Sequence, residues 1–321
     1  MQRFRFQSGL GHLACPLRLD LSRSTIGPIL LLGAALHLAG QVAPAQNQRS
    51  IDRTALIPTN QQRFVADLTG HQLLAGKGIG PRSTAAERAR AVQFLADSIE
   101  RHGRAAVRHE YRMAHPNGLV NLLLPPYRGT NLFTVIPSTA DSTEHVIVGA
   151  HYDTVPDSPG AIDNASGVAL VYALAQTLSQ LPDRPLNFML VFFDQEEDDE
   201  VGSRAFAQYL DGSSLPVHSV HIADLVGWNG NLDCAVEIQS PGPFLEEQYR
   251  AAAATLEIPL SVTQGASSDN KSFLQAGYRT VGVWDPDYSP HVHKSTDTYE
   301  TLNFDCIQST TGLVFEVLRR F

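Results

Sequence analysis

The chain has 321 residues and a formal net charge of −9, with 43% hydrophobic and 18% charged residues. This composition is typical of a globular protein that can bury a substantial core, either as one large α/β domain or as two ordinary ones. Because phosphate backbones require a basic surface, the acidic balance argues against a general nucleic-acid binder. We therefore expect no nucleic-acid partner.

The start of the chain has the pattern of an export signal rather than of a folded segment. Arginines precede an apolar run over residues 26–39, and a small-x-small cleavage motif ends at Ala45. The run is short and interrupted, which argues against a transmembrane helix and leaves an uncleaved anchor as the alternative. We expect a signal peptide over residues 1–45, a linker over residues 46–60 and a mature protein that is secreted or periplasmic, without membrane contact.

Three cysteines limit the disulfide chemistry of the chain. Cys15 leaves with the signal peptide, so Cys234 and Cys306 remain. In an exported protein these two can form one disulfide, and two isolated buried thiols are the alternative. The sequence alone does not show whether they meet.

Helices and strands alternate along the rest of the chain. Apolar residues recur at helical spacing in one set of segments, for example at Val168, Val171 and Leu174, which predicts helices. The expected helices span residues 64–74, 84–102, 163–181, 203–210, 244–256 and 304–320. The expected strands span residues 105–111, 131–136, 146–150, 186–193, 219–226 and 280–284.

This alternation predicts one α/β domain over residues 61–321, a sandwich with a central mixed, mostly parallel sheet flanked by helices. The segment 186–193 is too apolar for an edge strand, so we expect it at the centre of the sheet. Asp163 or Asn164 is expected to cap the third helix.

Two of the expected central strands end abruptly in polar residues. One apolar run leads into His151 and Asp153, and the other leads into Glu196 and Glu197. Ligands collect beyond the carboxyl ends of parallel strands. We therefore expect these side chains, together with Asp163, to converge on one crevice although they lie far apart in the sequence.

Residues 194–200 include six carboxylates. Alone, such a run more often indicates a solvated loop than a site. Here it follows a strand expected to be central, where mutual repulsion would be costly without cations. Imidazole and carboxylate ligands without cysteine suit zinc in a catalytic site. A zinc-binding histidine also donates its second ring N–H to a carboxylate, which His151-x-Asp153 would allow, although a lone His-x-Asp is weak evidence.

Four segments taken together resemble the co-catalytic zinc aminopeptidase family, the bacterial leucyl-aminopeptidase-like group to which glutaminyl cyclases and glutamate carboxypeptidase domains are related. The similarity extends from about residue 60 to the end of the chain. The matching segments are His151-Tyr152-Asp153, Asp163-Asn164-Ala165-Ser166-Gly167, Glu196-Glu197 followed by Gly202-Ser203, and His293-x-x-x-Asp297-Thr298. Each motif is weak alone, but their order and spacing are specific.

The resemblance implies a site for two zinc ions. Asp163 would bridge the ions, with His151 and Asp224 completing one site and Glu197 and His293 completing the other. His293 is preferred to the neighbouring histidine because only His293 has Asp-Thr four residues later. That neighbour is expected to lie on the surface or in the pocket wall.

The resemblance also implies the catalytic roles. Glu196 would be the general base and Asp153 would orient the first zinc-binding histidine. Tyr288 and Trp228 are candidates for pocket contacts by position alone. The chain departs from the family at Asn270, where histidine is frequent, which suggests an altered substrate-facing contact. The acidic residues after the glutamate pair either attract a substrate amino group or lie in solvent.

The expected function is therefore that of a zinc exopeptidase, which hydrolyses the N-terminal bond of a peptide or aminoacyl substrate through a metal-activated water. One alternative is a glutaminyl cyclase, whose single zinc is held at the positions of Asp163, Glu197 and His293. The Asn-Ala-Ser-Gly that follows Asp163 disfavours the cyclase. A second alternative is an inactive relative that serves as a binding module, which retention of all the ligand positions and of Glu196 disfavours.

Overall fold

The computed structural model describes residues 58–71, 78–228, 230 and 233–321, and one 8-stranded mixed sheet lies at their centre. The strand order is β1-β2-β4-β3-β5-β8-β6-β7. The strands are β1 Val107–Met113, β2 Tyr127–Ile136, β3 His145–His151, β4 Asn187–Phe193, β5 Val217–Ala223, β6 Val236–Gln239, β7 Leu260–Thr263 and β8 Thr280–Trp284. Four strand pairs are parallel and three are antiparallel. The predicted α/β class with a mixed, mostly parallel sheet is confirmed.

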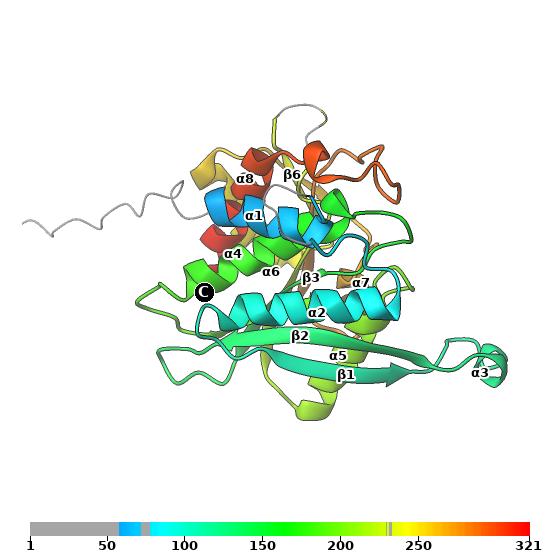
Figure 1. Cartoon of the computed structure of the whole chain (residues 1–321). Coiled ribbons are helices and arrows are strands. Elements are labelled where there is room, and N and C mark those ends of the chain that lie inside the picture. The colour runs from blue at the N-terminus through cyan, green and yellow to red at the C-terminus, as the bar shows by residue number, and fades with distance from the viewer. Residues whose placement is uncertain (1–57, 72–77, 229, 231–232) are drawn as a thin grey trace, which may run out of the picture. The chain divides into compact units, whose positions relative to one another are not determined.

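Helices cover both faces of the sheet and make a three-layer sandwich. The helices are α1 Pro58–Thr69, α2 Ala85–Glu100, α3 Val120–Leu123, α4 Ser166–Leu178, α5 Val201–Ser213, α6 Gly242–Leu256, α7 Asn270–Gln275 and α8 Phe304–Leu318, with a π-turn at Ala161–Ala165 and a 3₁₀ turn at Tyr299–Thr301. Apolar residues of α1, α2, α4, α6 and α8 share one core with the sheet, and α5 and α7 build the core on the other face. Figure 1 shows α2 and α5 on opposite sides of β1 and β2.

The central strands are apolar on both sides because both faces of the sheet are covered. In β3, Val146 and Val148 pack in the α4 core, whereas Ile147 packs in the α5 core. Every residue of β4 is buried, and β4 lies between β2 and β3, so its predicted central place is confirmed. A Cβ on Gly149 would lie 2.3 Å from the ring of Phe193, so this crossing requires glycine.

Several element ends differ from the predictions. Helix α1 begins at Pro58, within the expected linker. The expected strand over 219–226 ends at Ala223, because the chain leaves the sheet at Asp224 and Leu225 adopts a positive φ of 52°. The short strands β6 and β7 were not expected.

The start of α4 also differs from the prediction. This helix begins at Ser166 rather than at Asp163, after the π-turn, and its first residue is not capped by a side chain in the usual position. Asn164 still assists the first turn, because its Oδ1 accepts a hydrogen bond of 2.9 Å from the backbone N–H of Gly167. The π-turn keeps Asp163 outside helix α4 and directs it to the edge of the sheet.

Cys234 and Cys306 form a disulfide, with their Cα atoms 4.9 Å apart. The bridge joins the segment before β6 to the first turn of α8. Of the two alternatives left by the sequence, the disulfide is the one that the structure contains. Disulfides persist in oxidising compartments, so this bridge is compatible with export.

Arg82 is fully buried between α1 and α2 and ties distant loops together. Its guanidinium donates hydrogen bonds to the carbonyl oxygens of Leu68, Gly80, Tyr152, Pro159 and Gly160. Burial lowers the pKa of Arg82 to about 10, while the carboxylates of Asp153 and Asp297 oppose this shift. The side chain therefore stays charged at neutral pH and holds the end of β3 against the loop that precedes Asp163.

We predict that Arg82→Met lowers the free energy of unfolding by at least about 3 kcal/mol, because it leaves a set of buried carbonyls without donors. Arg90→Met is the matched control, since Arg90 is an exposed residue of α2 and its replacement should change stability by about 0.5 kcal/mol or less. Urea unfolding of both variants measures the difference. Equal stabilities would contradict the structural role given to Arg82.

Candidate metal centre

Imidazole and carboxylate side chains gather at the carboxyl ends of β3, β4 and β5. His151 is the last residue of β3, Glu196 and Glu197 follow β4, and Asp224 follows β5. Asp163 enters from the π-turn before α4. The loop after β8 supplies His293. The structure therefore brings together all the side chains that the sequence analysis assigned to the metal site.

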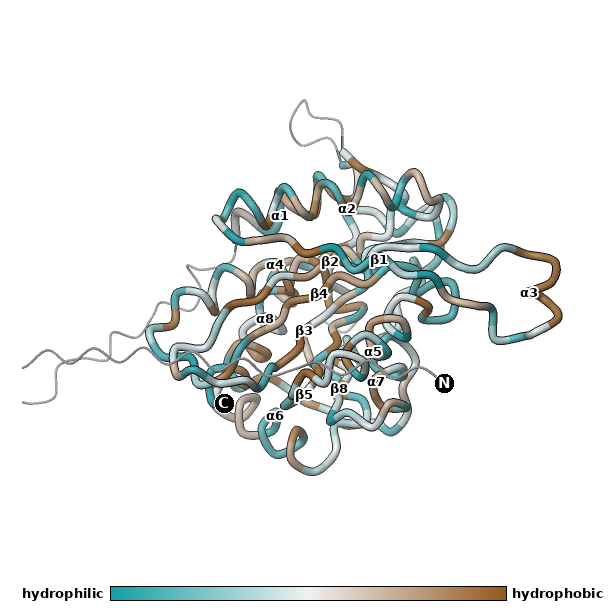
Figure 2. The backbone as a smooth tube through the Cα atoms, turned by 90° about the horizontal axis from the view of Figure 1, so that it is seen from below, coloured by the Kyte–Doolittle hydropathy of each residue, from teal (hydrophilic) through white to brown (hydrophobic). Residues whose placement is uncertain are grey.

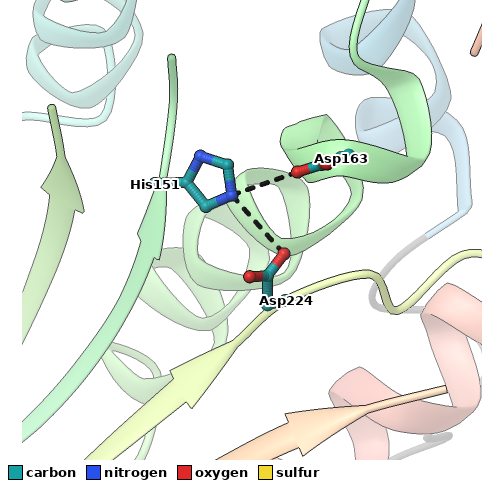
Figure 3. Close-up of side chains that lie close together, drawn as sticks. All are labelled: His151, Asp163 and Asp224. Atoms are coloured by element: carbon teal, nitrogen blue, oxygen red, sulfur yellow. Dashed lines mark ion pairs between the residues drawn. The ribbon is translucent and has the colours of Figure 1, made fainter. Parts of the chain in front are cut away.

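The first group consists of His151, Asp163 and Asp224, all of which are buried. His151 Nε2 lies 3.2 Å from Asp163 Oδ1 and 3.5 Å from Asp224 Oδ1. Figure 3 shows the imidazole directed between the two carboxylates, which come from separate elements. One nitrogen and two oxygens thus face a common point.

The second group consists of Asp163, Glu197 and His293. His293 Nε2 lies 3.1 Å from Asp163 Oδ2 and 3.1 Å from Glu197 Oε2. The His293 side chain is 54% exposed, so this side of the cluster is open to solvent. Asp163 therefore turns one carboxylate oxygen toward each histidine.

Asp153 contacts the two glutamates and the first histidine, and so fixes their positions relative to one another. Its Oδ1 accepts a 3.1 Å hydrogen bond from the backbone N–H of Glu196, and its Oδ2 accepts one of 3.2 Å from Glu197. The same Oδ1 lies 3.3 Å from Nδ1 of His151. The Glu196 carboxylate extends into the cluster, with Oε2 4.0 Å from His151 Nε2.

The crowding of carboxylates in a buried place disfavours their ionised forms. Burial raises the pKa of Glu197 to about 8, and the Asp163 carboxylate adds to the shift. Burial likewise raises the pKa of Glu196 to about 10, with His151 opposing and Asp224 reinforcing it. A cluster of this kind takes up protons or cations.

The donor set fits zinc. Among the described residues, the buried atoms His151 Nε2, Glu197 Oε1 and Asp224 Oδ1 have no hydrogen-bond partner. Buried polar atoms are normally satisfied, so these point to a ligand at this place. Nitrogen and oxygen donors without thiolates suit catalytic zinc. The two groups described above share Asp163, and a third group of His151, Glu196 and Glu197 overlaps them.

Two further carboxyl groups have structural roles that the sequence analysis did not assign. Asp297 Oδ1 accepts a 2.7 Å hydrogen bond from the N–H of Ile162, and its Oδ2 accepts one of 3.1 Å from Asp163. Asp269 is buried, and neither of its oxygens has a hydrogen-bond partner among the described residues. Burial raises the pKa of Asp269 to about 7. Asp297 stood in one of the motifs, but only its folded position shows what it contacts.

The remaining acidic residues do not face the metal cluster. Asp199 pairs with Arg204 at 3.0 Å, and Glu200 is buried against Lys271 at 2.8 Å. Asp198 and Asp199 are exposed, which agrees with the alternative that this run lies in solvent, whereas Glu200 is buried in its ion pair.

Asn270, the position at which the chain departs from the family pattern, also lies inside the fold. Asn270 is buried at the start of α7, and its Oδ1 accepts a hydrogen bond from the N–H of Ser268. A Cβ on Gly282 of β8 would lie 2.6 Å from its side-chain nitrogen, so the amide packs against that strand. The Asn270 side chain thus makes its contacts within the fold, and an altered substrate-facing contact stays a prediction.

The two aromatic pocket candidates differ in exposure. Tyr288 is 73% exposed, and partial burial followed by the carboxylates of Asp163 and Glu197 raises its pKa. Trp228 is half-buried and packs edge-on against His291, with ring centroids 5.4 Å apart.

The sequence model of peptidase family M28 matches residues 131–318, which include every residue of the metal centre. The chain therefore belongs to peptidase family M28. It is 31% identical to Aminopeptidase YwaD of Bacillus subtilis over 199 residues, which cover 57% of this chain and 43% of YwaD. The chain spans about half the length of the curated relatives that it matches.

Solved structures share the fold. The zinc aminopeptidase BSAP from Bacillus subtilis superposes with a TM-score of 0.70 at 16% identity, covering 81% of this chain and 94% of BSAP. A glutaminyl cyclase from Bacteroides thetaiotaomicron superposes with a TM-score of 0.68 at 17% identity, covering 81% of this chain and 97% of the cyclase. At these identities the likeness establishes the fold alone, and the fold does not separate the two activities.

We predict that Asp297→Asn weakens zinc binding roughly 10- to 100-fold, the usual effect of losing a group that orients a ligand. The new amide NH₂ would face a backbone N–H of Ile162 or Asp163 and displace the bridging carboxylate. Competition against a chromophoric chelator measures the affinity. Asp305→Asn, at an exposed position in the first turn of α8, is the control. Unchanged affinity in Asp297→Asn would contradict this role.

Proposed function

We propose that the chain is a zinc-dependent aminopeptidase that holds two ions and removes N-terminal residues from peptides. The observation that carries the proposal is the position of Asp163, whose two oxygens face His151 and His293 in two separate donor groups. Membership of peptidase family M28 supports peptide hydrolysis. The printed names of YwaD and BSAP, an aminopeptidase and a zinc aminopeptidase, support the finer assignment.

In this proposal His151, Asp163 and Asp224 hold one ion, and Asp163, Glu197 and His293 hold the other. Bound zinc would polarise the scissile carbonyl and lower the pKa of the attacking water. The half-exposed His293 lies on the side by which a substrate can enter. The carboxylates on that side also favour a free α-amine, which makes the enzyme an exopeptidase.

Glu196 is the proposed general base. Its carboxylate accepts a proton from the attacking water as the new C–O bond forms, and returns that proton to the amine nitrogen as the C–N bond breaks. Asp153 accepts hydrogen bonds from the backbone of both Glu196 and Glu197, so it fixes their adjacent positions. Successive residues leaving a strand point in different directions, which allows one glutamate to bind zinc while the other faces the water.

A glutaminyl cyclase with one zinc is the second candidate. Such an enzyme would need only the group of Asp163, Glu197 and His293. The complete first group, in which His151 Nε2 and Asp224 Oδ1 are buried without hydrogen-bond partners, favours two ions. A catalytically inactive binding module is disfavoured by Glu196, whose carboxylate reaches 4.0 Å from His151.

Removal and return of metal tests the proposed cofactor. We predict two zinc ions per chain in the purified protein, loss of aminoacyl-anilide hydrolysis after chelation, and recovery on adding zinc. Elemental analysis gives the ion count, and a panel of aminoacyl anilides gives the activity. One tightly held ion at saturating zinc, with cyclisation of N-terminal glutamine instead of hydrolysis, would favour the cyclase.

Substitution of the adjacent glutamates tests the proposed roles. Glu196→Gln should retain both ions, with kcat lower by roughly two to four orders of magnitude and KM little changed, because the lost proton transfer acts mainly in the transition state. Glu197→Gln is the matched variant and should lose affinity for one ion, with partial rescue by excess zinc. The reverse pattern, with a zinc-depleted Glu196→Gln and a fully metallated but inert Glu197→Gln, would overturn the assignment.

We also propose that residues 1–45 are a signal peptide and that residues 61–321 form the peptidase domain of a secreted or periplasmic protein. The Cys234–Cys306 disulfide supports an oxidising compartment. N-terminal sequencing of the exported protein should find its first residue at or near Gln46. A membrane-bound protein that retains its arginine-rich start would contradict this proposal.

A further inference from the structure

The β1–β2 hairpin ends in a tip, residues 114–126, that carries strongly exposed leucines. Leu119, Leu122 and Leu123 are 72%, 80% and 83% exposed, and Leu124 is 53% exposed. Elsewhere in the described part of the chain, only Tyr288 among the large apolar side chains is more than half exposed. Figures 1 and 2 show this tip, with α3 at its end, standing clear of the sheet and helices around it.

Polar side chains within the tip hold the leucines outward. The N–H of His115 donates to Asn121 Oδ1 at 2.7 Å, and Asn121 Nδ2 donates to the His115 carbonyl at 2.8 Å. The N–H of Leu119 donates to Asn117 Oδ1 at 2.9 Å, and the His115 ring packs against Tyr127. The polar groups are thus used inside the turn while the apolar groups face water, the reverse of an ordinary surface loop.

The stem of the hairpin is basic. Arg112 and Arg128 stand directly opposite each other in the β1–β2 ladder and are exposed, and their side chains have no hydrogen bond or ion pair with a described residue. Like charges directly opposite are destabilising, so this pair favours a bound anion. From Glu110 to Asp141 no acidic residue intervenes, although the whole chain has a net charge of −9.

We propose that the hairpin tip docks on the surface of an anionic lipid bilayer. The leucines would enter the apolar boundary of the membrane, and the two arginines would contact phosphate head groups. An apolar tip with a cationic stem matches that surface in both hydropathy and charge. Such a contact needs no spanning helix, and no helix of the described residues is long and apolar enough to cross a bilayer.

A second copy of the chain is a poorer match for the tip. A standard protein interface uses about 20–30 residues from each partner, many more than the leucines of one turn. Two tips in contact would also bring two pairs of unpaired arginines together. The charge of the stem therefore favours lipid phosphate over another copy.

Docking by this tip would orient the metal centre. Leu132 of β2 pairs with Phe192 of β4, and the N–H of Thr130 donates to Asp194 Oδ2 at 3.0 Å. The hairpin therefore leaves the sheet at the edge where β4 delivers its glutamates. A protein held by the tip would keep this edge turned to the membrane rather than away from it. This inference goes beyond the proposed hydrolysis and does not depend on it, and it replaces the expectation from the sequence that the mature protein makes no membrane contact.

Co-sedimentation of the mature, metal-loaded protein with vesicles tests the proposal. We expect binding to vesicles of phosphatidylcholine with phosphatidylglycerol, and weaker binding at high salt. Leu122→Ser with Leu123→Ser should lower the partition coefficient at least about tenfold. Arg112→Gln with Arg128→Gln should reduce binding to the anionic vesicles and remove most of the salt dependence. Leu274→Ser, at a 44% exposed position of α7, is the control and should bind as the wild type does.

Absence of binding to anionic vesicles, or unchanged binding by the double leucine variant, would overturn the proposal. Light scattering that shows a dimer, dissolved by the same leucine substitutions, would assign the tip to a second copy and also overturn it. Thermal unfolding at the wild-type midpoint in all variants verifies the fold independently of any enzymatic activity.

Discussion

The mutual repulsion of buried carboxylates at one edge of the sheet is the constraint on which this structure depends. Asp163 and Asp224 belong to one group and Asp163 and Glu197 to another, and within each group the ligand atoms lie within 4.8 Å of one another. Without positive charge, such an arrangement is costly in a buried place. Parallel strands explain how it arises, because β3, β4 and β5 end at the same edge and each delivers side chains there.

The surrounding fold keeps the loops in place against this repulsion. An apolar residue stands next to three of the ligands in sequence, and these residues pack into one small cluster. Its buried members are Ile162, Leu225 and Val292. Asp297 accepts two backbone hydrogen bonds from the π-turn, and Arg82 donates to the carbonyls around it. The ligands are therefore positioned by packing and backbone hydrogen bonds, which is the preorganisation that a catalytic centre requires.

Sequence patterns could predict the main elements of the site because its strands are strongly apolar and end abruptly. The buried run of β4 indicated the central strand, and the polar residues after it are among those that the structure brings together. The strands β6 and β7 escaped prediction because each has four residues, too few to show a period. The start of α4 was misplaced because Asn164 assists the helix from outside it.

Contacts between distant segments were beyond sequence reasoning. The buried arginine at position 82 looks like an ordinary loop residue until its acceptors, on three other segments, are seen. Asp297 was noticed only as a marker for His293, because its backbone partners lie more than 130 positions away. The pairing of the two cysteines likewise depends on the tertiary fold.

Anomalous diffraction at the zinc edge, from crystals grown with zinc, tests the central claim most directly because it locates each ion. We predict two peaks, one on each side of the Asp163 carboxylate. One should lie beside His151 and Asp224, and the other beside Glu197 and His293. A single peak in the second group, or peaks away from Asp163, would contradict the assignment of this edge of the sheet as a two-ion centre.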